Sequence, residues 1–70
     1  MNSKKAAAQE LLEKKIEAWT GVFKGLIAQV QINPLFDYSD AVEKIYRDNP
    51  QDRGAIHQAE ILAYQGEVKK

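Results

Sequence analysis

The sequence predicts an all-α protein in which one long N-terminal helix packs with two shorter helices folded back antiparallel, as a helical hairpin or three-helix arrangement. Two observations support this fold. Apolar residues recur at helical spacing along most of the chain, and two prolines divide the chain into three segments. No flexible linker or low-complexity run lies outside these segments, so residues 1–70 are expected to form a single domain.

The first segment predicts a helix over residues 4–31, with Ser3 as the N-cap because its hydroxyl can accept a hydrogen bond from a free amide of the first turn. Apolar residues follow it at spacings typical of a helix packed lengthwise on another. This stripe consists of Leu12, Ile16, Trp19, Phe23, Leu26 and Val30. Leu11 and Val22 on one side and Ile27 on the other widen it to about 160° of the helix circumference. The helix is therefore expected to contact two neighbours.

Three residues of this helix allow two interpretations each. Lys15 lies within the apolar face, where its stem can cover apolar surface while its ammonium reaches water, or where it can form a buried ion pair. Gly21 and Gly25 lie on the outer face, and each costs about 0.8 to 1 kcal/mol relative to alanine. They mark either a flat spot where another backbone approaches or a tolerated bend.

The second segment predicts a helix over residues 35–48, because the dipeptide before it, Asn33-Pro34, ends the first helix. Its start has two possible positions. Asn33 can cap a helix that begins at Pro34, or a short turn can precede a helix capped by Asp37 or Ser39. The inward-facing stripe is expected to contain Leu35, Tyr38, Val42 and Ile45.

The third segment predicts a helix over residues 50–65. Asn49 and Asp52 are expected to form a capping box around Pro50, and Gly66 is expected to end the helix in a left-handed conformation. The inward stripe is expected to contain Ala55, Ile56, Ala59, Leu62 and Ala63. A second side of the same helix carries His57, Ile61 and Tyr64, which have no obvious neighbour within one chain.

The composition offers little for catalysis or ligand binding. There is no cysteine and only one histidine, so neither a disulfide nor a metal site is expected. The hydroxyl groups have no base nearby in sequence, and the glycines do not form a phosphate-binding loop. We therefore expect no catalytic residue, no cofactor and no small-molecule substrate.

The charges balance at ten basic and ten acidic residues. Residues 1–33 carry a net charge of +2, from five lysines and three glutamates, and residues 34–70 carry −2, from five basic and seven acidic residues. Segments of opposite sign suit a chain that folds back on itself, although a difference this small also arises by chance. No run of eighteen apolar residues and no signal peptide is present, so a cytoplasmic protein without a membrane span is expected.

These features predict a small interaction protein that acts by helix packing against itself or a protein partner, as an adaptor, a chaperone-like protein or an assembly or regulatory factor. A chain of 70 residues has a thin stability margin, so an oligomer such as a dimer is expected. The residues expected at partner or dimer contacts are Leu11, Trp19, Val22, His57, Ile61 and Tyr64.

The alternative function is a small nucleic-acid-binding regulator. It would use residues 40–65 as a helix-turn-helix or the lysines of the first helix as a basic strip. The acidic residues Asp48 and Asp52 beside the turn, and the net negative charge of that half, make nucleic acid the less favoured partner.

Overall fold

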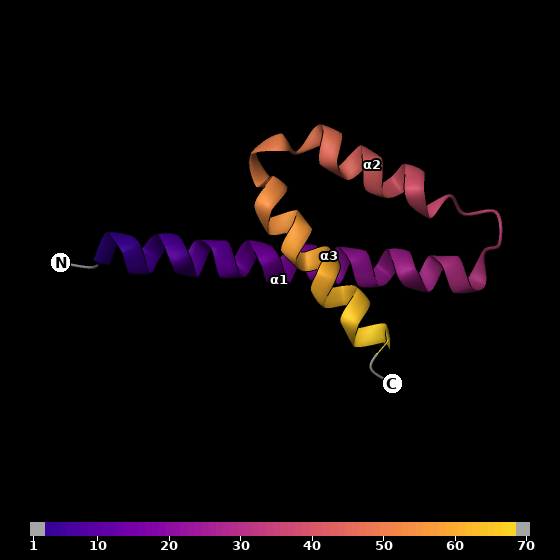
Figure 1. Cartoon of the computed structure of the whole chain (residues 1–70), viewed down its shortest axis with the longest axis horizontal. Helices are drawn as coiled ribbons and strands as arrows, with labels where there is room; N and C mark the ends of the chain where they lie inside the picture. Colours follow the sequence, from indigo (N-terminus) through magenta and orange to yellow (C-terminus); the bar gives the residue numbers. More distant parts are fainter. Residues whose placement is uncertain (1–2, 69–70) are drawn as a thin grey trace.

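The computed structural model describes the backbone of residues 3–68 and the side chains of residues 6–66. Within this range the chain forms α1 (Ser3–Ile32), α2 (Tyr38–Asp48), the short 3-10 helix η1 (Pro50–Asp52) and α3 (Arg53–Val68). α2 runs back beside the C-terminal half of α1, and α3 reverses direction again and crosses the middle of α1 obliquely (Figure 1). The predicted all-α arrangement of three helices is confirmed.

The start of α2 decides between the two predicted positions. The helix begins at Tyr38 rather than at residue 35, because the Asp37 carboxylate caps it by accepting a hydrogen bond from the Asp40 amide at 3.0 Å. A turn precedes the cap, in which the Asn33 side chain accepts from the Leu35 amide at 3.1 Å. Leu35 is left 91% exposed in this turn, so its predicted place in the inward stripe was wrong.

The predicted capping box at the third helix was also wrong. The Asn49 side chain makes no cap hydrogen bond there, and instead donates to the Ile45 carbonyl at 3.0 Å at the end of α2. The Asp52 carboxylate accepts from Lys15 of α1 at 2.9 Å. Both side chains therefore hold the turn to the rest of the molecule, and the 3-10 helix supplies the entry into α3.

The other helix ends differ from the predictions by a few residues. α1 includes Ser3, the predicted cap, and continues one residue beyond the predicted end, to Ile32. α3 continues through Gly66 to Val68, and no described glycine has a positive φ. The predicted left-handed end at Gly66 was wrong, because a glycine followed by residues that can continue a helix weakens the helix without ending it.

The core lies where α3 crosses α1. The buried apolar side chains are Phe23 of α1 and Ala55, Ile56, Ala59 and Ala63 of α3. Phe23 and Ile56 are the only large side chains that are fully buried among those described. The alanines let α3 lie close to α1, and a ring of partly buried side chains surrounds the contact: Ile16, Trp19, Leu26, Ile27, Val42, Ile45 and Tyr46.

The middle of the predicted α1 stripe is thus core, while its two ends are not. Leu12 and Val30 are each almost half exposed, because α3 is too short and too oblique to cover them. Leu62, predicted to face inward, is 48% exposed, so that prediction was wrong. In the oblique crossing the buried surface of α3 narrows to Ile56 and the alanines, and Leu62 lies at the edge of the contact.

Two polar contacts fix the short elements to this core. The Lys15 ammonium forms an ion pair with Asp52 at 2.9 Å, with the carboxylate mostly buried and the lysine half exposed. This selects the ion-pair interpretation of Lys15, in a partly buried form. The Tyr46 hydroxyl of α2 donates to the Glu60 carboxylate of α3 at 2.8 Å. Together the two contacts tie η1 to α1 and α2 to α3.

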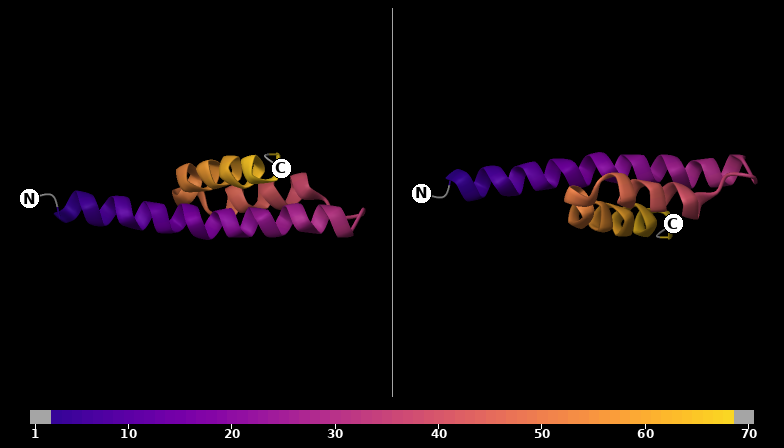
Figure 2. Two further views of the ribbon diagram at one scale, coloured as in Figure 1. Left: turned by 90° about the horizontal axis from the view of Figure 1, so that it is seen from below. Right: turned by 90° about the horizontal axis from the view of Figure 1, so that it is seen from above.

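The molecule is more extended than a compact domain of its size. Its radius of gyration is 13.9 Å, whereas about 11 Å is expected for 70 residues. Its accessible surface is 5493 Å², which exceeds by about 1,100 Å² the surface expected for a compact monomer of 7.9 kDa. The N-terminal part of α1 extends well beyond the other helices (Figure 2). Much of the apolar surface of α1 therefore lacks an intramolecular cover.

Truncation of Phe23 should unfold the chain. Because its ring is fully buried at the crossing, Phe23→Ala is expected to cost about 3 to 5 kcal/mol of unfolding free energy, which is most of the stability of a small domain. Urea unfolding followed by far-ultraviolet circular dichroism measures the loss. Leu12→Ala is the control, since Leu12 belongs to the same stripe outside the crossing. Equal losses in the two variants would contradict this core.

The Tyr46–Glu60 contact predicts a stability change at alkaline pH. Burial, and then the hydrogen bond to Glu60, raise the pKa of Tyr46 from 10.0 to about 12. The neutral phenol is therefore favoured by folding, and this contribution is complete below pH 10 and is lost as the pH rises to about 12. Unfolding free energies measured across this range should fall more for the wild type than for Tyr46→Phe. Identical pH profiles would show that the contact does not affect the ionisation of Tyr46.

Candidate interaction surfaces

One side of α3 carries three of the six predicted contact residues together. His57, Ile61 and Tyr64 line a hollow of about 510 Å³, whose other walls come from Glu60 and Gln65 of α3 and from Tyr38 of α2. Ile61 is almost half exposed and Tyr64 is 65% exposed. Tyr38 was predicted to face inward and was not predicted at this surface. Its part in the hollow depends on where α2 starts, which the sequence left open.

A second hollow continues this surface onto α1. It has a volume of about 340 Å³, and Tyr38 and Tyr64 line it as well. Its remaining walls are Ile27, Val30 and Gln31 from the last turns of α1. The two hollows form one apolar strip across three helices, which we call the tyrosine groove and define by Ile27, Val30, Tyr38, Ile61 and Tyr64.

The polar groups around the tyrosine groove are few. Burial, and then the nearby Glu60 carboxylate, raise the pKa of Tyr38, so its phenol is neutral at physiological pH. Glu60 also accepts the hydrogen bond from Tyr46, which orients the carboxylate. The groove therefore offers apolar and aromatic surface with a phenol and a carboxylate beside it.

The three predicted contact residues of α1 lie elsewhere. Leu11 and Val22 are exposed, and Trp19 is partly buried against the core. Leu11 and Val22 are separated by about 16 Å along the helix axis. Neither they nor Trp19 are among the residues that line the tyrosine groove.

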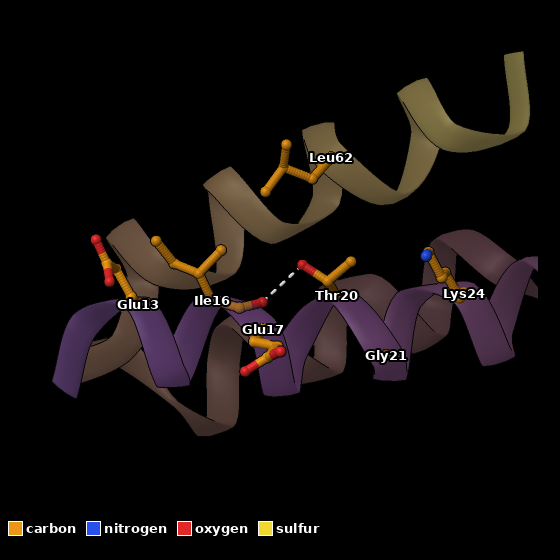
Figure 3. Close-up of a pocket in the computed structure, with 7 residues that line it drawn as sticks. All are labelled: Glu13, Ile16, Glu17, Thr20, Gly21, Lys24 and Leu62. Atoms are coloured by element: carbon orange, nitrogen blue, oxygen red, sulfur yellow. Dashed lines mark hydrogen bonds between the residues drawn. The ribbon is translucent and has the colours of Figure 1, made fainter. Parts of the chain in front are cut away.

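Another groove lies on α1, and of its residues only Gly21 was considered from the sequence as a place where another backbone approaches. We call it the α1 flank, and it has a volume of about 570 Å³ between α1 and the exposed side of Leu62 (Figure 3). Six residues of α1 line it: Glu13, Ile16, Glu17, Thr20, Gly21 and Lys24. The Thr20 hydroxyl donates to the Ile16 carbonyl at 2.6 Å, so it is occupied within the helix. From the sequence alone, the charged residues on this side of the helix indicate an ordinary solvent-exposed face. The groove exists only because α3 lies beside it.

No helix within residues 3–68 combines the length and the apolar character needed to cross a membrane. In the same part of the chain, no three histidine or carboxylate side chains gather in a way that could hold a metal ion. The chain matches no protein-family model, no curated protein and no solved structure.

Proposed function

We propose that this protein is a non-enzymatic interaction protein, an adaptor or assembly factor of the cytoplasm, that binds a protein partner through the tyrosine groove. The observation that carries the proposal is the apolar strip formed by side chains of three helices, in which Tyr38 and Tyr64 line both hollows and Ile61 is exposed in the first. Exposed apolar side chains that gather from several helices can mark a site of protein interaction.

The size of the uncovered surface supports this function. The chain exposes about 1,100 Å² more than a compact monomer of its mass. A stable protein interface covers about 800 Å² on each partner. One such contact would therefore bring the exposed surface close to that of an ordinary small protein.

The composition of the groove also suits a protein partner. Tyrosine gives a large and rather rigid contact area while keeping a hydroxyl available for hydrogen bonds, and it is enriched at interfaces. The groove has apolar walls from three helices, so an amphipathic helix that lays its apolar face between them is the partner segment that fits best.

A nucleic-acid-binding role has less support. In the segment that would act as a helix-turn-helix, Asp48 and Asp52 lie at the turn and form ion pairs with Arg47 and Lys15. Arg53 is the other basic residue next to the turn. The helix that would read bases, α3, is buried against α1 along its alanine side. Nucleic-acid binding is therefore an outcome to be checked in the test below rather than a second proposal.

The test compares two charge insertions on the same helix. Ile61→Glu places a carboxylate in the tyrosine groove, whereas Gln58→Glu adds the same charge at an exposed position of α3 outside it. Both variants should keep the helicity of the wild type, because neither residue is buried. Affinity capture from the source cells, with nuclease treatment, should recover a defined protein with the wild type and with Gln58→Glu, and lose it with Ile61→Glu.

Three results would contradict the proposal. Capture that is equal for all three chains would show that the tyrosine groove is ordinary surface. Capture that nuclease treatment abolishes would favour the nucleic-acid alternative. Loss of helicity in Ile61→Glu alone would show that Ile61 belongs to the folding core.

A further inference from the structure

The α1 flank has an ordered arrangement of charges. Glu13 and Glu17 lie at its N-terminal end, Thr20 and Gly21 at its centre, and Lys24 at its C-terminal end. The ion pairs among the described side chains are Lys15–Asp52 and Arg47–Asp48, so the charged groups of the flank have no partner there. Glu17 and Lys24 are about 10 Å apart along α1, which is too far for them to pair with each other.

Two copies of the flank have complementary charges when their α1 helices run in opposite directions. The geometry points to a second copy of this chain, whose α1 packs antiparallel on the α1 flank with the crossing point between Thr20 and Gly21. In this register Glu17 of each copy lies opposite Lys24 of the other, and the two-fold symmetry makes both ion pairs at once. The inference goes beyond the proposed function, because it names a second copy as the partner and uses a surface separate from the tyrosine groove.

The centre of the flank is suited to close approach of two helices. Gly21 has no side chain, and a Cβ atom built there would meet nothing within 4 Å, so packing within one chain does not require glycine. The Thr20 side chain is small and its hydroxyl is already bonded to the Ile16 carbonyl. The backbone can therefore come near a second helix without leaving an unpaired polar group.

Apolar contacts border this centre. Leu62 extends from α3 over the flank, where it is 48% exposed, and Ile16 lies beside it, partly buried (Figure 3). Leu62 and Ile16 thus give the flank apolar surface that the α1 of a second copy can cover.

A charge-exchange experiment tests the second copy and its register together. Glu17→Lys gives a flank with only positive charge at the pairing positions, and Lys24→Glu gives one with only negative charge. Each variant alone should dissociate at least about tenfold more readily than the wild type at low ionic strength. An equimolar mixture of the two should assemble again, because every pairing position then faces its opposite. The double variant Glu17→Lys with Lys24→Glu should also assemble.

Sedimentation equilibrium measures the mass, with the monomer at 7.9 kDa and the assembly at twice that value. Lys44→Glu is the matched control for Lys24→Glu, since it makes the same charge change at an exposed position of α2, and its association should equal that of the wild type. Circular dichroism of each variant separates dissociation from unfolding.

Two results would overturn the inference, and neither decides the proposed function. A wild-type chain that remains at 7.9 kDa over the micromolar range would exclude the second copy, while capture of a different protein through the tyrosine groove would still stand. Self-association that the single variants do not weaken, or that mixing them does not restore, would show that the copies meet elsewhere. Both proposals would be supported if the wild-type chain forms a dimer that the charge exchange controls and if Ile61→Glu loses capture of the protein partner.

Discussion

The buried apolar cluster at the crossing of α1 and α3 is the interaction on which the rest of the structure depends. Among the described residues, Phe23 and Ile56 are its two large side chains that are fully buried, and the buried alanines Ala59 and Ala63 allow the helices to come close. The positions of α2 and η1 follow from that crossing, because Tyr46 bonds to α3 and Lys15 of α1 bonds to Asp52. A core with so few large side chains leaves other apolar residues uncovered, and the tyrosine groove and the α1 flank are both bordered by such residues.

Much of the fold was predictable because helical spacing is a local property. The α1 stripe through Ile16, Trp19 and Phe23 and the alanines of α3 both appear in the sequence as repeats of three and four residues. The crossing angle was not predictable in this way, because it depends on how two helix surfaces interlock. The exposure of Leu12 and Leu62 follows from that angle, and so the predicted stripes were too long.

The candidate surfaces also differ in how far the sequence alone predicts them. His57, Ile61 and Tyr64 could be grouped from the sequence because they lie on one side of one helix. Tyr38 joins them only through the turn that places the start of α2, and the α1 flank becomes a groove only when Leu62 of α3 lies beside it. A surface built from several helices can be predicted only when the tertiary arrangement is known, whereas a surface on one helix can be predicted from the sequence. The capping box at Asn49 and Asp52 failed for a related reason, since a distant lysine competes for the same carboxylate.

The extension of α1 beyond the other helices has a consequence for its order. Every described side chain before Lys15 is exposed, so tertiary packing contributes little to the stability of residues 6–14. A separate helix of that length is only marginally stable in water, because forming the first turn is unfavourable and few further hydrogen bonds follow to offset it. These turns are helical because they extend a helix that is already nucleated by its packed middle part. The N-terminal turns of α1 therefore owe their stability to the packed middle of the same helix.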